Sequence, residues 1–563
     1  MGRGFPGGHG GGYSLSILAH YGGPRSMEGS RGRVPAGLQA RRLSVTALVV
    51  GVAAAFSLAI GWYQLFGLRE LHQYLEYDDG VWFGTSVRLA HGIFPYRNFV
   101  DDQPPGVPVA MFPFALWSRS VGTATAFAAA RVVVPLVETV GVVALGWMLR
   151  HRGALTVAVA CGAMAVYPVC LIDQRTVMLE PFSATLCVLG LAAVFDGDRL
   201  SGRTGALVVG GASFGLACSC KAFAVLPFVV VAAALLASPA RRRLVPFLAG
   251  TAGALAVVCG PFFALAPSAF VHDLIVTQLS RTASVEPSIY DRLTSLIGSP
   301  PSEVPTPLPD PSERTLAVLL AVVVVMLVVG GYVAERVRAR RHQTSALSAL
   351  PAGWFTRLDT VAVAVVVLTG TGLATPPAYY YHYAAFFGPF LALMLGLAAG
   401  RIALIAPTTV AIVTAAVLLA GAVHAVNVVR SSRGGLPDVA LIRSFVPAGA
   451  CVLGDDAPTL LLADRFSAAV PGCTAVTDAF GTTISSDGSY PASSPEAQSP
   501  ASVKIWLDAL EHADYVVLVL GYQERRIPWD APPLQSYLRN DFSTVHSAGY
   551  VILKRRKYVA PAR

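Results

Sequence analysis

Two pairs of adjacent aspartates within residues 77–106 are the side chains of this chain best suited to chemistry. Asp78 and Asp79 open a short amphipathic run, and Asp101 and Asp102 stand one residue before the Pro-Pro-Gly that starts the next apolar segment. A carboxylate beside hydrocarbon is costly to desolvate, so an acidic cluster at a membrane boundary is a candidate functional site. A carboxylate placed there can remove the proton of an acceptor hydroxyl.

The first aspartate pair also has a purely structural interpretation. The run DDGVWFGTSVRLAHG ends at Gly92 and predicts a short interfacial helix lying along the membrane. A helix N-terminus stabilises carboxylates, so Asp78 or Asp79 could simply cap this helix. Capping does not account for Asp101 and Asp102, and the four residues together therefore favour a functional site.

The composition is that of a polytopic membrane protein. Of the 563 residues, 54% are hydrophobic and only 13% are charged, whereas soluble proteins carry roughly 25% charged residues. The apolar runs have the length of a bilayer-spanning helix, about 17 to 25 residues. The net charge of +9 lies largely in short loops that stay in the cytoplasm, so we expect a lipid bilayer as partner and no nucleic acid.

The chain divides into three predicted regions. Residues 1–40 are Gly-rich and predict a disordered cytoplasmic segment, and residues 41–429 predict a transmembrane domain with extracytoplasmic loops 68–104 and 267–314. The basic loops favour about eleven crossings, with the N-terminus in the cytoplasm and the C-terminus outside. The number of crossings between residues 105 and 152 stays open, because two apolar segments there must make one net crossing.

Residues 430–563 are more polar and predict a small extracytoplasmic α/β domain. The stretches ACVLGDD, ADYVVLVLG and GYVILKRR are typical of strands, and APTLLLADR is typical of a helix. Cys451 and Cys473 are the only two of the eight cysteines in this region, and outside the cytoplasm they could pair as a disulfide. The others lie in or at the ends of apolar runs, where thiols pack like small apolar groups.

The order of these features resembles that of a known family. A first span, an acidic pair opening a surface helix, a G-x-x-P-Y motif at residues 92–96 and a Pro-Pro-Gly before the second span are similar to the GT-C membrane glycosyltransferases. The branch that the chain resembles includes the protein O-mannosyltransferases and the lipid A aminoarabinose transferase. The resemblance covers residues 44–425, through YPVCLIDQRTVMLEPFSATLCVLGL, GASFGLACSCKAFAVLPF and YYYHYAAFFGPFLALMLG. It departs from the family at Gln103, where many members have Lys before Pro-Pro.

The resemblance implies an α-helical GT-C fold in the plasma membrane. It also implies transfer of a sugar from a polyprenyl-phosphate donor to a glycan, lipid or protein acceptor of the cell envelope, on the outer face. Such a transfer needs a base, here Asp79 or Asp78, and cations that stabilise the departing phosphate. Lys221, at the end of a predicted helix, and Arg175 are the candidates for the phosphate contact.

Both cations also have simpler interpretations. Lys221 could snorkel from a helix end towards the headgroups. Arg175 could pair with Asp173 or Glu180, which lie near it in the sequence. Neither alternative needs a substrate.

The remaining candidates for substrate contact are Asp101, Asp102, Glu180, Tyr381 and His382. His382 follows three tyrosines and precedes a fourth, which an interfacial aromatic belt explains equally well. Some family members place a divalent metal near an acidic residue and a histidine, and Asp79 with His272 or His382 would be the counterpart. No metal-ligand spacing is visible, so we assign no metal or other cofactor.

Two other functions fit a membrane protein with this sequence. A transporter or flippase for a lipid-linked intermediate would have internal repeats and polar residues at the bilayer midplane, whereas here the polar residues gather at one interface. A non-catalytic envelope-assembly protein would tolerate the loss of Asp78 and Asp79. The Gly-, Ala- and Arg-rich composition is compatible with an actinobacterial envelope, and a mannosyltransferase-like donor would match the relatives.

Overall fold

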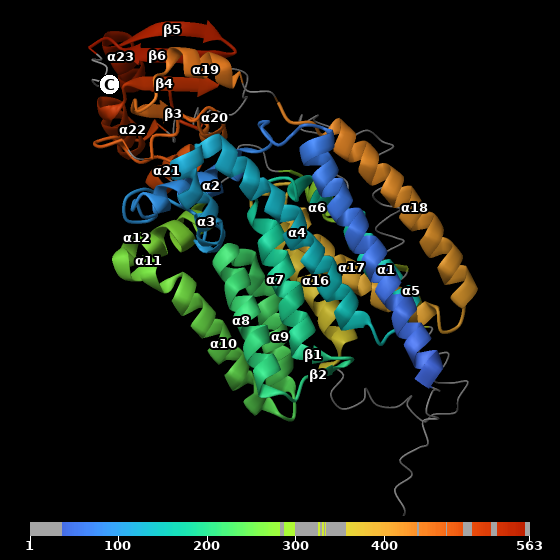
Figure 1. Ribbon diagram of the computed structural model, residues 1–563. Helices are drawn as coiled ribbons and strands as arrows, with labels where there is room; N and C mark the ends of the chain where they lie inside the picture. Colours follow the sequence, from blue (N-terminus) through green and yellow to red (C-terminus); the bar gives the residue numbers. More distant parts are fainter. Residues whose placement is uncertain are drawn as a thin grey trace, which may run out of the picture.

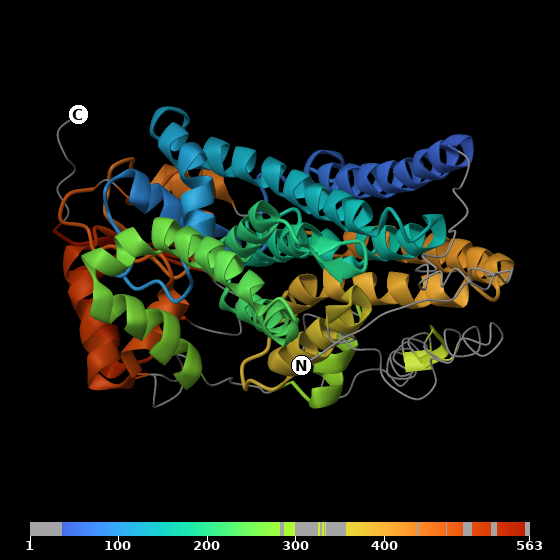
Figure 2. The ribbon, with the colours of Figure 1, turned by 90° about the horizontal axis from the view of Figure 1, so that it is seen from below.

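A computed structural model of the chain places a bundle of long helices below a small sheet with its own helices (Figure 1). The residues that it describes are 36–281, 287–298, 325–326, 329–331, 333, 356–435, 438–468, 470–487, 498–519 and 526–557. Most of the apolar run at 315–333 and nearly all of the predicted disordered segment at 1–40 lie outside these residues. The view from below shows the sheet at one end of the bundle, with the long helices running away from it (Figure 2).

Four helical stretches of the described residues are long and apolar enough to cross a membrane. They are α1 (Ala36–Trp62) with the short π-helix η1 (Tyr63–Gly67), α4 (Thr123–Leu149), α17 (Tyr383–Ile402) and α18 (Pro407–Ser431). The shorter apolar helices are α5 (Ala154–Ala165), α7 (Leu179–Val194), α8 (Thr204–Cys220), η2 with α9 (Ala222–Ala224, Val225–Ala237), α10 (Leu244–Val258) and α16 (Leu358–Ala374). All of them lie in the apolar runs of the sequence, and the chain is a multi-helix membrane protein.

Small residues bring neighbouring helices of the bundle close together. Helices α8 and α10 cross at Gly211 and Gly250, where any side chain would collide with the facing backbone. Close backbone approach at small residues is how helices associate in membranes. This crossing fixes the course of α8, which ends immediately before Lys221.

Short helices connect the bundle to the sheet. They are α2 (Tyr77–Ala90), α3 (Gly106–Val121), α6 (Pro168–Asp173), α11 (Gly260–Leu265), α12 (Pro267–Val271), the π-helix η4 (His272–Val276), α13 (Thr277–Ser280) and α14 (Ile289–Leu296). In Figure 1, α2, α3, α11 and α12 lie between the two parts of the molecule.

Helix α2 is where the sequence predicts a surface helix, but it does not lie exposed along the membrane. Trp82 and Phe83 are buried, and Gly80 faces Pro458 of α20 (Ala457–Leu462) so closely that a side chain would collide. The C-terminal part of the chain packs against α2, so nearly the whole helix is interior and the prediction of an interfacial helix is corrected.

The C-terminal part is built on a four-stranded sheet in the order β3-β4-β6-β5. Strands β3 (Val452–Gly454) and β4 (Tyr515–Val519) are parallel, with Val452 opposite Tyr515, and β6 (Tyr550–Arg555) and β5 (Phe542–Ala548) continue the sheet antiparallel. The accompanying helices are α19 (Val439–Phe445), α20, α21 (Ala479–Asp487), α22 (Pro500–His512) and α23 (Pro532–Asp541). Strands β3, β4 and β6 and helix α20 lie where the sequence places them.

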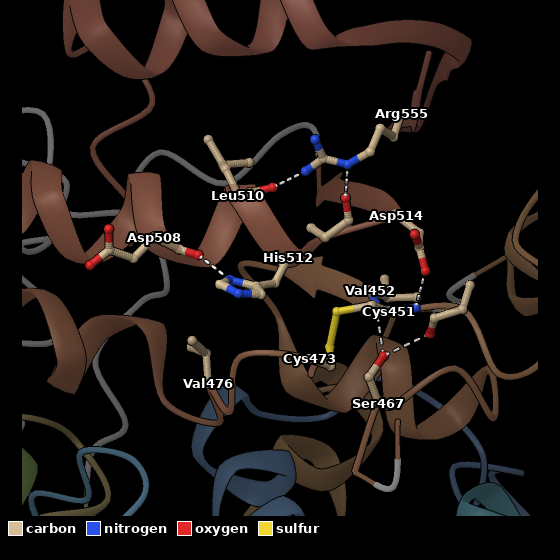
Figure 3. The surroundings of a disulfide bond; sticks show 12 residues. Cys451, Val452, Ser467, Cys473, Val476, Asp508, Leu510, His512, Asp514 and Arg555 are labelled. Carbon is tan, nitrogen blue, oxygen red and sulfur yellow. Dashed lines mark hydrogen bonds between the residues drawn. A yellow bond between two sulfur atoms is a disulfide. The ribbon is translucent and has the colours of Figure 1, made fainter. Parts of the chain in front are cut away.

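A disulfide joins Cys451 to Cys473 beside the first strand of this sheet (Figure 3). The backbone N–H of Cys451 donates to Asp514 at 2.9 Å, and the N–H of Val452 donates to Ser467 at 2.8 Å. The pair is the one that the sequence singled out. It ties the segment after α20 to the start of β3.

The opposite end of the bundle carries a hairpin, β1 (Phe195–Asp196) and β2 (Arg199–Leu200), and the short helix η3 (Arg241–Arg243) (Figure 1). An ion-pair network lies there. Arg152 and Arg401 both bind Asp359, at 2.9 and 3.1 Å, and Arg152 also pairs with Asp198. Basic residues of the short loops therefore gather at the end away from the sheet.

Candidate active site

Asp79 is held by the interior of the protein. Its carboxylate accepts two hydrogen bonds from Arg131, at 2.5 and 2.9 Å, and one from the backbone N–H of Val177 at 2.7 Å. Neither Asp79 nor Arg131 has exposed surface. Arg131 also donates to the carbonyl groups of Leu71 and Gln73, so Asp79 fixes α2 against α4 and the chain before α2.

Asp78 has a different environment, although it is the preceding residue. It is half-buried and makes no hydrogen bond or ion pair within the described part of the chain. Burial and the negative charges of Asp478 and Glu76 raise the pKa of its carboxyl from 3.8 to about 8, and Lys221 opposes this shift. Because its pKa lies near neutrality, Asp78 can exchange a proton at physiological pH.

The second aspartate pair lies in the loop before α3, with both side chains buried. Asp102 pairs with Arg281 at 3.2 Å. Asp101 accepts a hydrogen bond from the hydroxyl of Thr85 at 3.1 Å, and its backbone N–H donates to Asp273 at 3.3 Å. Burial and the charge of Asp102 raise the pKa of Asp101. The pair thus connects α2 with the segment η4–α13.

Lys221, Glu180 and His382 form a second charged group, on three different elements. Lys221 Nζ lies 2.9 Å from Glu180 Oε1, and His382 Nε2 lies 3.8 Å from the same oxygen. Burial lowers the pKa of His382 to about 4, although Glu180 opposes that shift, so the ring is neutral at physiological pH. Glu180 therefore holds Lys221 in place at the end of α8 while the histidine stays uncharged.

A cavity of about 420 Å³ lies between the Asp102–Arg281 pair and Lys221. Small-molecule sites have volumes of about 300 to 1,000 Å³, so this one is large enough for a sugar phosphate. Its polar lining consists of Asp102, Gln103, Lys221, Gln278, Arg281 and Thr375, and the other lining residues include Phe223, Leu274, Leu279, Pro376, Pro377 and Tyr383. Asp78 is not one of the lining residues, but two residues of the lining, Lys221 and Asp102, act electrostatically on its carboxyl.

Arg175 and Tyr381 do not line the cavity. Arg175 pairs with Glu70 at 2.7 Å, and not with Asp173 or Glu180, the partners that the sequence offered as the alternative to a phosphate contact. Glu70 is distant in the sequence, so no local pattern indicated it. The hydroxyl of Tyr381 donates to Glu76 at 2.7 Å. Both residues hold the chain that leads into α2.

The C-terminal part contributes residues that sequence reasoning did not find. The hydroxyl of Tyr77 donates to Asp478 at 2.9 Å, and Arg526 stacks over the Tyr77 ring with its Cζ 3.7 Å from the centroid. Arg88 donates to Thr477 at 2.7 Å. These contacts span some 400 positions, and no local pattern could reveal them.

Sequence reasoning also did not single out Arg281, although its position offered an indication. Arg281 ends the stretch FVHDLIVTQLSR, whose pattern is typical of a helix and which contains η4 and α13. No group of three or more His, Cys, Asp or Glu residues within the described ranges is arranged to hold a metal ion. His272 pairs with Asp273 at 3.2 Å, and Asp79 is committed to Arg131.

Solved structures give the fold a name. ArnT from Cupriavidus metallidurans in the apo state matches with a TM-score of 0.55 at 14% identity, covering 90% of this chain and 97% of that one. ArnT bound to undecaprenyl phosphate matches with a TM-score of 0.53, also at 14% identity, over 94% and 100% of the two chains. The Archaeoglobus fulgidus oligosaccharyltransferase with Zn and sulfate is a weaker likeness, with a TM-score of 0.48 at 13% identity over 84% and 68%.

The chain therefore has the GT-C fold of membrane glycosyltransferases, as its sequence predicted. The likeness to ArnT extends over nearly the whole length of both chains. No protein-family model matches the chain, and no curated protein matches it in sequence.

Proposed function

We propose that this chain is a membrane glycosyltransferase that moves a sugar from a polyprenyl-phosphate donor to a hydroxyl of a cell-envelope glycan, lipid or protein. One observation carries the proposal: Lys221 and Arg281 line a single cavity, and the charges of its lining residues Lys221 and Asp102 act on the carboxyl of Asp78. Two cations suit a phosphate, and a carboxyl with a pKa of about 8 suits proton transfer. ArnT, which shares the fold, is solved with undecaprenyl phosphate bound.

The proposed reaction assigns each group one task. The acceptor hydroxyl gives its proton to the Asp78 carboxylate as its oxygen bonds to the anomeric carbon of the sugar. The bond between that carbon and the phosphate oxygen breaks, and the electron pair leaves with the polyprenyl phosphate. Lys221 and Arg281 stabilise the charge that develops on the phosphate, which is where preorganised cations act most strongly.

The charged partners of both cations keep them in position. Glu180 binds Lys221 at 2.9 Å, and Asp102 binds Arg281 at 3.2 Å. A donor phosphate would share these cations with the carboxylates. Leu274 and Leu279 on the same cavity wall suit the first apolar units of a lipid tail. Asp79 is the less suited base, since Arg131 already occupies its carboxylate.

The proposed orientation of the chain in the membrane follows from the position of its basic residues. Basic residues gather at the end of the bundle away from the sheet, and basic loops stay in the cytoplasm. The cavity, the disulfide and the sheet would then face outward, where disulfides persist. About eleven crossings, with the N-terminus inside, fit this arrangement.

The test is transfer of radiolabelled sugar by the purified full-length chain from a panel of polyprenyl-phosphate donors, mannosyl and arabinosyl donors included. Transfer from at least one donor supports the proposal. Absence of transfer from every donor, together with movement of a fluorescent polyprenyl phosphate across the bilayer of reconstituted vesicles, would establish a flippase in its place.

A further inference from the structure

We propose that Asp478, supplied by the C-terminal part of the chain, is a positioning residue of this site that strengthens the hold of Asp78 on its proton. The inference rests on the proposed role of Asp78 as base. It makes the sheet-containing part of the chain a component of the active site.

A single hydroxyl ties Asp478 to the helix that carries Asp78. Asp478 directly precedes α21 and is 5% exposed, and its Oδ1 accepts a hydrogen bond from Tyr77 at 2.9 Å. The Tyr77 oxygen in turn accepts hydrogen bonds from the backbone N–H groups of Ala479, at 2.9 Å, and Phe480, at 3.3 Å. Because Tyr77 is the first residue of α2, these bonds hold the starts of α2 and α21 together.

Arg526 secures the same tyrosine by stacking on its ring. Its guanidinium Cζ lies 3.7 Å from the ring centroid, and Tyr77 is buried. The quadrupole of an aromatic ring attracts a cation placed over its face, and more strongly where the ring is desolvated. The tyrosine is thus fixed at its ring and at its hydroxyl, which leaves Asp478 little freedom to move away from α2.

The charges around Asp78 come from four elements. Its facing groups are Glu76 before α2, Asp102 before α3, Lys221 after α8 and Asp478 before α21, and Tyr383 of α17 senses its charge. Three carboxylates therefore oppose one ammonium group. Asp478 exerts the largest effect of these charges on Asp78.

Asp478 and Asp78 differ in their protonation at neutral pH. Burial and Asp102 raise the pKa of Asp478 to about 6, whereas the pKa of Asp78 rises to about 8. Asp478 is therefore the ionised member at neutral pH. A negative neighbour favours the protonated form of a carboxyl, so Asp478 makes Asp78 the better proton acceptor.

Asp478 also precedes a helix, and capping α21 would be a purely structural role. The proposal therefore needs a readout that capping would not move. Labelling of Asp78 by a membrane-permeant carbodiimide, which reacts with protonated carboxyls, is such a readout. The labelled fraction is followed by mass spectrometry of the full-length chain from about pH 5 to about pH 10, and its midpoint reports the pKa of Asp78.

In the Asp478→Asn variant we expect the labelling midpoint to fall by about one pH unit, since a neighbouring negative charge has been removed. Asp478→Glu keeps the charge and should restore the wild-type midpoint. Asp464→Asn is the matched control: Asp464 also joins the C-terminal part to the bundle, accepting from the N–H of Ala124 at 2.9 Å. Its midpoint should equal that of the wild type.

Equal midpoints in the wild type and Asp478→Asn would overturn the proposal. If Asp478→Asn does not fold, Tyr77→Phe takes its place, because loss of the hydroxyl releases the Asp478 carboxylate from α2. That variant should also lower the midpoint, and an unchanged value would contradict the positioning role. The labelling uses no sugar donor, so a shifted midpoint in a chain that transfers no sugar would refute the proposed reaction alone.

Discussion

Arg131 binds Asp79 through two hydrogen bonds, 2.5 and 2.9 Å long, and neither side chain has exposed surface. Asp78 has no such partner in the described part of the chain. Adjacent aspartates on one helix thus have separate tasks. Asp79 holds the helix, and Asp78 is not committed to a partner among the described residues.

The variant Asp79→Asn should lose stability because it leaves Arg131 buried without its counter-charge. Breaking a buried ion pair costs about 3 to 5 kcal/mol. Thermal unfolding in detergent should therefore show a clearly lower Tm for Asp79→Asn than for Asp78→Asn. Equal melting temperatures would show that the pair contributes nothing to the fold.

The variants Lys221→Gln and Arg281→Gln should raise the KM for the lipid donor. Each removes one charge from the cavity, and a charge-assisted hydrogen bond contributes about 1.5 to 3 kcal/mol, so a KM increase of roughly 10- to 150-fold is expected. Steady-state transfer assays at varied donor concentration give this value.

The matched control is Arg401→Gln, at the opposite end of α17 from Tyr383. The two residues are separated by about 27 Å along the helix, and Arg401 pairs with Asp359. Its donor KM should equal that of the wild type. A KM unchanged in Lys221→Gln and Arg281→Gln would show that the donor phosphate binds elsewhere.

Because the pKa of Asp78 is raised, we expect the folded state to lose stability as the pH rises. The pKa rises from 3.8 to about 8 in the folded chain, so the folded state holds this proton over a pH range in which the unfolded state has released it. Stability from this group is complete below about pH 4 and is lost as the pH rises through about 8. Asp78→Asn does not ionise, so its Tm should exceed that of the wild type progressively from pH 4 to 8. A constant Tm difference across that range would contradict the raised pKa.

Loss of the disulfide should loosen the C-terminal part selectively. Cys451 and Cys473 are separated by 22 positions, and closing a loop of that size contributes about 3 kcal/mol. The double variant Cys451→Ser, Cys473→Ser should be cut faster by protease between residues 438 and 557, while the bundle fragment persists. Cys161→Ser, in a buried position of the bundle, is the control. An unchanged cleavage rate in the double variant would show that the bond does not stabilise the sheet.

The helices of the bundle could be predicted because each needs only a local apolar run. Runs such as 123–149 mark a span by length and composition alone, and β4 and β6 follow from short apolar stretches between polar ones. Burial of α2 could not be predicted in this way. The sequence pattern indicated an interfacial helix, but α20 packs against it, and that contact joins residues 80 and 458.

The residues of the candidate site could also be predicted only where a local pattern indicates them. The aspartates, Lys221 and His382 were found because charged or polar groups next to apolar runs stand out. Asp78 and Asp79 could not be ranked from the sequence, because the difference between them depends on Arg131, 52 positions from Asp79. Asp478 lies in an ordinary polar stretch, and only the folded chain brings it to Tyr77.

The most direct test of the proposed function compares sugar transfer by the purified wild type and by Asp78→Asn, each confirmed to be folded, with one polyprenyl-phosphate donor that the wild type uses. General-base catalysis contributes about 10²- to 10⁴-fold, so kcat should fall by that factor in Asp78→Asn while donor binding remains. Transfer at the wild-type rate by Asp78→Asn would contradict the assignment of Asp78 as the base.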